Sequence, residues 1–173
     1  MTRIENIMFF WTRLLVFLIA VITVIECNAV EDSRGNPFIT QDVKRYQVKG
    51  EFSEIKDFLI LAITERGIKI SSTSYISKML KRTREDVGGG KNIYKNAEAI
   101  GFCSATLSRQ MMESDPHHIV FCPYTIVIYE LNEQPGTIYL SFRRPFYTDT
   151  STTDKSLQKI DELLSGIITE IVE

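Results

Sequence analysis

Apolar and polar residues alternate along four stretches of the chain, and a period of two is typical of half-buried β-strands. These stretches cover residues 45–49, 68–72, 119–131 and 137–143. In the third stretch the strand is expected to begin after Pro123, because proline has no N–H to donate to a neighbouring strand. The polar segment NEQPG at 132–136 separates the last two strands and predicts a hairpin loop.

Three segments before residue 114 carry apolar residues at intervals of three and four, which predicts helices. The first is expected to begin at a Ser53 cap and to end at Arg66, with Gly67 as its stop. A short helix is predicted over 75–84, and a third over 97–113. The apolar stripe of the first helix is Ile55, Phe58, Leu59, Ala62 and Ile63, and that of the third is Ile100, Cys103, Leu107 and Met111.

The last predicted helix has the widest apolar face. Thr153 is expected to cap it, and it runs to about Val172. Such a face must be buried on the sheet or against a second subunit. We predict a homodimer; the rival interpretation is that the sheet covers the whole face. The residues concerned are Leu157, Ile160, Leu163, Leu164, Ile167, Ile168 and Ile171.

Together these elements predict an α+β fold in one small domain over residues 44–173. Four strands are expected to form an antiparallel or mixed four-stranded sheet, with helices packed on it. Composition agrees with a globular domain, since 44% of the residues are hydrophobic and 24% are charged. A net charge of −2 disfavours a nucleic-acid binder, which usually has a strong basic excess.

The N-terminal residues have the pattern of an export signal. Residues 14–25 are apolar except for Thr23, Arg3 and Arg13 precede them, and a small-residue cleavage site ends at Ala29. We predict a signal peptide over 1–29, a linker over 30–43, and a periplasmic or extracellular domain. Translation could begin at Met8. The alternative is an uncleaved membrane anchor over residues 7–25, which would be the only membrane contact.

No catalytic motif is present, and no catalytic residue is assigned. The sequence has no G-x-S-x-G and no H-E-x-x-H. The glycines at 88–90 precede a lysine, but no strand leads into them and Asn92 stands where a phosphate loop needs Ser or Thr. A flexible loop is therefore expected there, and no cofactor is implied.

Two cysteines remain after the predicted cleavage site, Cys103 and Cys122. An even cysteine count in an exported protein is compatible with a disulfide, which would be worth about 3 kcal/mol if unstrained. Two buried free thiols and a redox or ligand-binding pair are the alternatives. All three interpretations stay open.

The remaining candidates are His117 with His118 and Arg143 with Arg144. The histidines could join the cysteines in binding a metal or haem, but their spacing fits no standard pattern, so a solvated turn is favoured. The arginines could bind an anion, but a surface ion pair with Glu130 across the hairpin is favoured. Two adjacent methionines, at 111 and 112, are expected in the helix core.

Several short motifs occur in a fixed order, and with them the chain resembles the domain of unknown function 302 family over roughly residues 44–145. This resemblance implies a small α+β fold that often self-associates, and it implies no established activity. The motifs are YQV at 46–48, AITERG at 62–67, YKNA at 94–97, FCSA at 102–105, DP at 115–116, CPYTI at 122–126 and FRRP at 142–145.

From these observations we expect an exported, non-enzymatic binding or accessory domain. The alternative is a periplasmic thiol-redox or metal- or haem-binding protein that uses Cys103 and Cys122.

Overall fold

The computed structural model of the chain describes residues 38–39, 42–145 and 154–173. The predicted signal or anchor segment lies outside these residues, as does nearly all of the predicted linker. All described residues belong to one compact unit that spans residues 34–173. Within the described ranges, no helix is long and apolar enough to cross a membrane.

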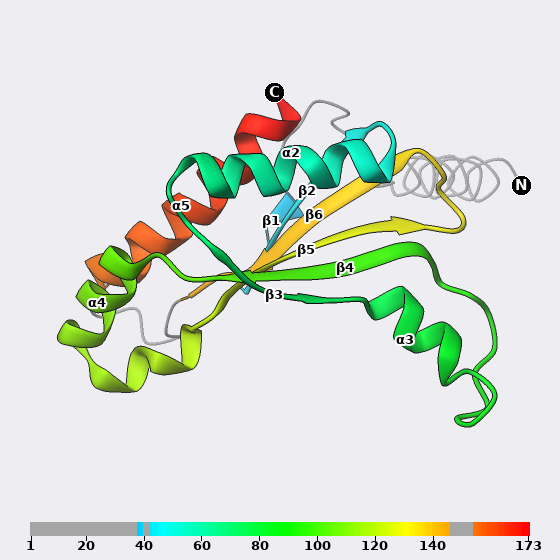
Figure 1. Cartoon of the computed structure of the whole chain (residues 1–173), viewed down its shortest axis with the longest axis horizontal. Coiled ribbons are helices and arrows are strands. Elements are labelled where there is room, and N and C mark those ends of the chain that lie inside the picture. Colours follow the sequence, from blue (N-terminus) through cyan, green and yellow to red (C-terminus); the bar gives the residue numbers. More distant parts are fainter. Residues whose placement is uncertain (1–37, 40–41, 146–153) are drawn as a thin grey trace, which may run out of the picture. The chain divides into compact units, whose positions relative to one another are not determined.

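The centre of the domain is one antiparallel sheet with the strand order β1-β2-β6-β5-β4-β3 (Figure 1). The prediction of four strands was wrong, because five strands have five or more residues and the two-residue β1 extends one edge. The sheet is antiparallel, which is one of the two arrangements predicted. The strands are β1 Phe38–Ile39, β2 Val43–Lys49, β3 Ile70–Ser74, β4 Tyr94–Phe102, β5 Tyr124–Leu131 and β6 Thr137–Arg143.

The strand that the sequence analysis missed is β4, which lies between β3 and β5. The helix predicted over 97–113 was wrong, because its apolar stripe joins two elements. Ile100 belongs to β4, whereas Leu107 and Met111 belong to α4, Ala105–Ser114. Strand packing also accounts for Gly101: a Cβ atom there would lie 2.4 Å from Ser72 Oγ, so any other residue would have to displace that side chain.

The hairpin prediction was confirmed. In β5 and β6 the residues of one face are buried, and those of the other face are mostly half-buried or exposed. Ile138, Leu140 and Phe142 all lie in the core, as the alternation predicts. The segment before β5 forms a 3-10 helix, η1, over Pro116–Phe121, and β5 begins at Tyr124, directly after Pro123, as predicted.

The two long helices, α2 Phe52–Glu65 and α5 Lys155–Val172, lie side by side on one face of the sheet (Figure 1). The predicted caps were wrong: Glu51 precedes α2 without a side-chain cap, and Asp154 caps α5 by accepting from the Ser156 N–H. Gly67 does end the first helix, with a φ of 69°. The short predicted helix is α3, Ile76–Arg82.

The core lies between the sheet and these two helices. Met111 is fully buried in it, as expected, whereas Phe58 of the predicted α2 stripe is 47% exposed. Most of the wide α5 face is buried within this one chain, and Ile168 is 0% exposed. The sheet and α2 therefore cover most of the face that suggested a second subunit.

Candidate functional site

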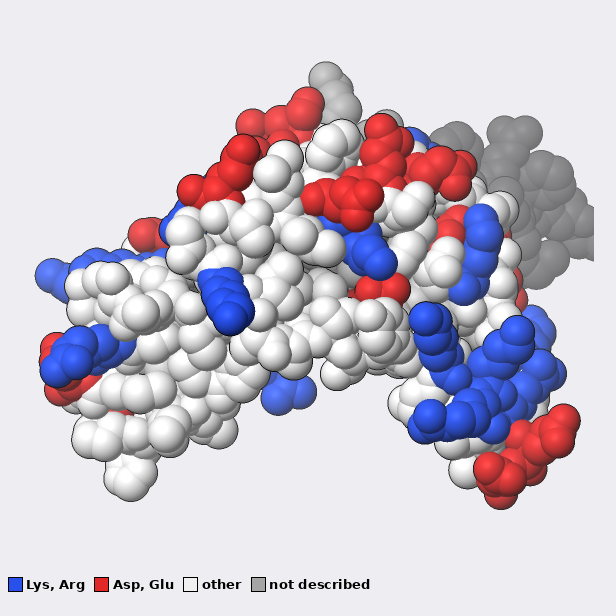
Figure 2. All heavy atoms as spheres, in the orientation of Figure 1, with Lys and Arg blue, Asp and Glu red and all other residues white. Residues whose placement is uncertain are grey.

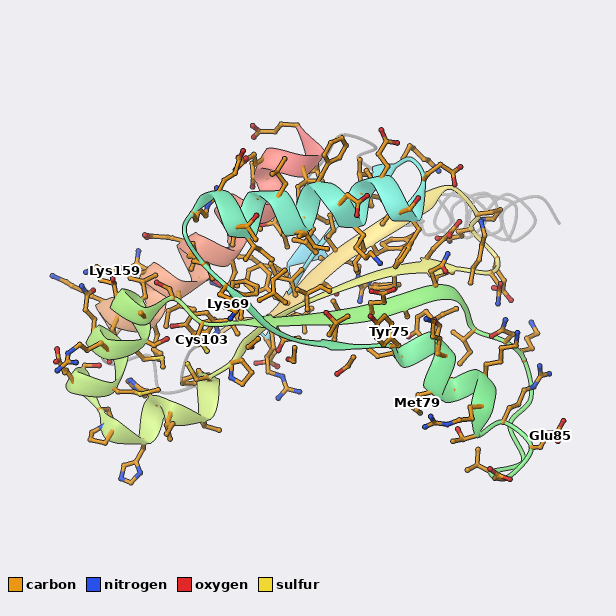
Figure 3. All side chains as sticks on the ribbon, in the orientation of Figure 1. Lys69, Tyr75, Met79, Glu85, Cys103 and Lys159 are labelled. Atoms are coloured by element: carbon orange, nitrogen blue, oxygen red, sulfur yellow. The ribbon has the colours of Figure 1, made fainter. Side chains whose placement is uncertain are left out.

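The two cysteines lie together at the end of the β4–β5 ladder. Cys103 follows β4, Cys122 precedes β5, and their Sγ atoms are 3.4 Å apart. Both are free thiols of intermediate exposure. The expected place of Cys103 on a helical stripe was wrong, since it lies before the Ser104 cap of α4 (Figure 3). Everything between the two thiols forms one excursion from the sheet, made of α4 and η1.

A hydroxyl group on the first turns of α4 extends this thiol pair. Ser108 Oγ lies 3.3 Å from Cys122 Sγ and 2.9 Å from the Tyr124 hydroxyl, so four polar side chains form a continuous chain of contacts. Neither Ser108 nor Tyr124 was predicted from the sequence as a site residue. The signal that could have found Tyr124 is its place two residues after Cys122, at the same end of β5.

The surroundings make both the thiol and the phenol weak acids. Burial, followed by the hydrogen bond to Cys122, raises the pKa of the Cys103 thiol to about 11. Burial likewise raises the pKa of Tyr124 to about 12, although the Ser108 hydrogen bond opposes it. Because the thiolate is the reactive form of cysteine, Cys103 is a slow nucleophile at neutral pH.

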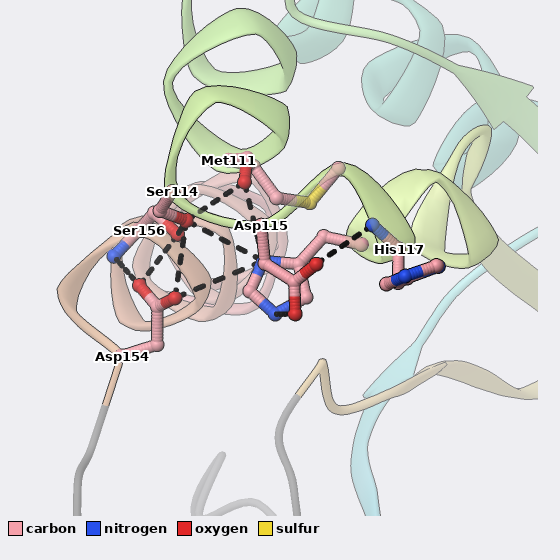
Figure 4. Close-up of polar contacts among 7 residues, drawn as sticks. Met111, Ser114, Asp115, His117, Asp154 and Ser156 are labelled. Atoms are coloured by element: carbon pink, nitrogen blue, oxygen red, sulfur yellow. Dashed lines mark hydrogen bonds and ion pairs between the residues drawn. The ribbon is translucent and has the colours of Figure 1, made fainter.

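The two histidines have different surroundings, and the favoured interpretation of a solvated pair was wrong for one of them. His117 is exposed, and its backbone N–H donates a hydrogen bond to Asp115 Oδ1 at 2.8 Å. His118 is 1% exposed, with Nδ1 3.7 Å from Asp154 Oδ2 and Nε2 3.8 Å from Asp115 Oδ2 (Figure 4).

The groups around His118 are helix-end groups. Asp115 caps η1, Asp154 caps α5, and Ser114 near the end of α4 contacts both Asp154 and Ser156. The pKa of Asp154 is lowered, and the largest cause is the hydrogen bond from the Ser156 side chain. This arrangement ties three helix ends together, which is a structural role. Within the described ranges, no three His, Cys, Asp or Glu side chains are grouped to hold a metal ion.

The two arginines, Arg143 and Arg144, have different surroundings. Arg144 Nε donates to Asp161 Oδ1 of α5 at 3.0 Å, whereas Arg143 is exposed. The predicted pair of Arg143 with Glu130 was wrong, because Glu130 pairs in the sheet with Ile138. Its carboxylate accepts hydrogen bonds from Lys95, Asn96 and the Gly136 N–H.

Three tyrosines form a cluster on the sheet face opposite α2 and α5. Tyr129 and Tyr139 are directly paired across β5 and β6, and their rings stack at a centroid distance of 5.1 Å. Tyr94 meets Tyr129 edge to face at 5.7 Å. All three are half-buried. We call this surface the tyrosine face. The hairpin pattern could have revealed it, because its register places residues 129 and 139 opposite each other.

A positive charge lies beside the tyrosine face. Burial raises the pKa of Tyr129, and the charge of Arg45 on β2 opposes that rise because it favours the phenolate. By strand alternation the exposed Arg143 side chain is on the same face, two residues from Ser141. This arrangement can bind flat, apolar groups that carry a negative charge.

The comparisons with known proteins give a family and a fold. A family model described as domain of unknown function DUF302 matches residues 44–171. The crystal structure of an uncharacterized conserved DUF302 protein from Bacillus stearothermophilus is similar, with a TM-score of 0.61 and 12% sequence identity. The alignment covers 78% of this chain and 100% of that chain. No curated protein matches.

Proposed function

Because the chain belongs to the family of the domain of unknown function DUF302, whose description names no activity, we propose a function from its own side chains. The domain is an exported, non-enzymatic binding domain for a planar anionic ligand, and the ligand lies on the tyrosine face. The carrying observation is the stacked pair Tyr129–Tyr139 on the sheet face opposite the two long helices.

Tyrosines suit this role for two physical reasons. Their rings give a large contact area with few rotatable bonds, so that little conformational entropy is lost on binding. Stacking between Tyr129 and Tyr139, with Tyr94 against the edge, also holds the rings in place before a ligand arrives. Arg45 and Arg143 then select for a negative charge.

The other candidate groups support a non-enzymatic function. His118 is enclosed by helix-end carboxylates, and Arg144 is engaged with Asp161. The raised pKa of Cys103 disfavours rapid nucleophilic attack at neutral pH. His118 and Arg144 are thus held in structural roles, and Cys103 is weakly reactive.

The test uses a planar aromatic anion, 8-anilinonaphthalene-1-sulfonate, as the probe. We expect its fluorescence to rise on binding to the unmodified protein and its affinity to fall by about tenfold or more in Tyr129→Ser/Tyr139→Ser, as each stacked aromatic contributes about 1 kcal/mol. The matched control is Phe58→Ser, which removes an exposed ring from α2. Equal affinity in the tyrosine variant, with its circular dichroism unchanged, would contradict the proposal.

A second candidate function is thiol–disulfide exchange, and the 3.4 Å separation of Cys103 and Cys122 favours it. Two thiols would lose two protons and two electrons to an external disulfide, closing a Cys103–Cys122 bond and releasing two external thiols. The new bond would link the two ends of the excursion formed by α4 and η1.

Incubation with oxidised glutathione, followed by mass spectrometry, tests this second function. In the peptides that contain Cys103 and Cys122, an exchange protein should lose two hydrogen masses without keeping glutathione, and Cys122→Ser should instead keep it as a mixed disulfide on Cys103. If both thiols stay reduced in a glutathione buffer as oxidising as the endoplasmic reticulum, exchange is not the function.

A further inference from the structure

Helix α3 is attached to the domain without contributing to its core. It packs beside β4, yet none of its residues is buried. Large apolar side chains of the helix and its ends are exposed, among them Tyr75, Met79 and Leu80 at 48%, 43% and 40%. Shortly after the helix, Val87 is 74% exposed. Exposed apolar groups gathered in one segment are typical of an interaction surface.

The same segment is basic. Residues 75–87 contain Lys78, Lys81, Arg82 and Arg84 against Glu85 and Asp86, so four positive charges against two negative charges leave +2, whereas the whole chain carries −2. Among the described residues, no carboxylate pairs with Lys78, Lys81 or Arg82; Lys78 lies 4.5 Å above the Tyr75 ring.

On the face drawn in Figure 2, the densest group of cations lies apart from the main run of acidic side chains. Figure 2 shows the cations gathered over α3 and acidic side chains along the surface of α2 and α5. In Figure 3, Met79 projects from the side of α3 that faces away from these two helices, and Glu85 lies beyond the helix end. The domain therefore has a charge polarity that would turn α3 toward a negative surface.

We propose that α3, with Tyr75 and Val87 at its two ends, docks on the surface of an anionic lipid bilayer. Lysine and arginine on one side of a short helix, with tyrosine and aliphatic side chains beside them, match an interface of phosphate headgroups over hydrocarbon. The hydrocarbon of a bilayer also offers an apolar environment for the exposed Met79 and Leu80. The apolar stretch expected at residues 7–25 would bring the domain to such a surface during or after export.

The experiment places one tryptophan reporter on α3 in the full chain. The single natural tryptophan is replaced by Trp11→Phe, and Met79→Trp is added. The matched control carries Leu61→Trp on the exposed side of α2, where the exposed fraction is similar at 51%. Each protein is mixed with vesicles of phosphatidylcholine alone or with added phosphatidylglycerol. Because both reporters share the same N-terminal segment, its own membrane affinity contributes equally.

We expect emission from the reporter at position 79 to shift to the blue only with phosphatidylglycerol and to return in high salt, where charge attraction is screened. Lys78→Gln/Lys81→Gln should weaken this binding by about 25-fold, from about fivefold per cation. Lys155→Gln/Lys159→Gln, which removes the same charge from α5, should leave it unchanged.

Three results would overturn the proposal. The first is an equal response of the position 79 reporter to both lipids, and the second is an equal response of the two reporters. The third is a shift at position 79 that grows with protein concentration in the absence of lipid, which would assign α3 to a contact with a second copy of the chain.

Discussion

Lys44 donates a hydrogen bond of 2.6 Å to Asp161 and thereby joins β2 to α5, across 117 positions of sequence. Both side chains are largely buried, with exposed fractions of 14% and 12%. Arg144 donates to the other carboxylate oxygen of Asp161 at 3.0 Å. One carboxylate thus fastens the last helix to two parts of the chain, on the sheet face that forms the core.

The first prediction concerns the loss of this carboxylate. Asp161→Ala should lower the free energy of unfolding by about 3 kcal/mol, because two cations lose their partner in a place with little water. Urea denaturation measures the change. Glu170→Ala is the control: it breaks an exposed pair with Arg66 and should cost less than about 1 kcal/mol. If the two variants lose similar amounts of unfolding free energy, burial does not make the ion pairs of Asp161 more stabilising than an exposed pair.

The second prediction is a pH dependence of stability that originates in Glu130. Burial tends to raise the pKa of Glu130, but hydrogen bonds from the Gly136 N–H, Lys95 and Asn96 outweigh it and lower the pKa. Its contribution to stability is therefore complete above the unfolded pKa of about 4.3 and is lost as the pH falls through the lower folded value. Glu130→Gln should cost about 2 kcal/mol at pH 7 and much less near pH 3.

Glu133 provides the control for this prediction, since it lies in the same hairpin and pairs only with exposed Lys91. Glu133→Gln should leave the free energy of unfolding nearly unchanged at both pH values. A cost for Glu130→Gln that is the same at pH 7 and pH 3 would mean that the shape of the side chain, and not its charge, stabilises the hairpin.

The third prediction is slow alkylation of Cys103. With its pKa raised to about 11, little thiolate exists at pH 7, and the rate should climb as the pH rises toward that value. Iodoacetamide labelling of Cys122→Ser from pH 7 to pH 11 measures this rate. Removal of Cys122 also removes one cause of the shift, so the variant should react somewhat faster than Cys103 does in the unmodified protein. Rapid labelling of both at pH 7 would contradict the prediction.

The fourth prediction concerns export. The sequence features of residues 1–29 lead us to expect cleavage after Ala29, with Val30 as the first residue of the mature chain. Mass spectrometry of the N-terminal peptide from the natural source decides between the alternatives. An intact N-terminus beginning at Met1 or Met8 on a membrane-bound form would instead support the anchor over residues 7–25.

The sequence predicted the hairpin of β5 and β6 residue by residue because its alternation is strict and its loop is polar. The sequence-based prediction failed at β4. Ile100 of the strand happens to continue the helical spacing of Leu107 and Met111 in the following helix. What makes residues 94–102 a strand is pairing on both sides, with β3 and with β5. Such pairing has no local signature, so tertiary contacts override the pattern.

The candidate site was also only partly predictable, because some of its contacts depend on strand pairing that has no local signature in the sequence. Cys103 and Cys122 could be selected from composition, but their contact depends on β4 being a strand that pairs with β5. The pairing of Tyr129 with Tyr139 follows from the hairpin register and was within reach. The burial of His118 was not, because it depends on Asp154, which is 36 positions later and comes from a different helix.

The last prediction concerns self-association, for which the sequence suggested the α5 face. The structure places Ile168 at 0% exposure in a single chain, so a charge there would be buried without a partner. Ile168→Asp should therefore abolish folding, costing about 4 kcal/mol or more, and should not yield a soluble monomer. Leu163 and Ile171 are the residues of the predicted α5 face that are only half-buried and can still contact a second copy. If the homodimer uses this helix, Ile171→Asp should keep the circular dichroism of the fold and halve the mass measured by light scattering. A mass near one chain for the unmodified protein at micromolar concentration would instead mean that the sheet and α2 satisfy the whole face.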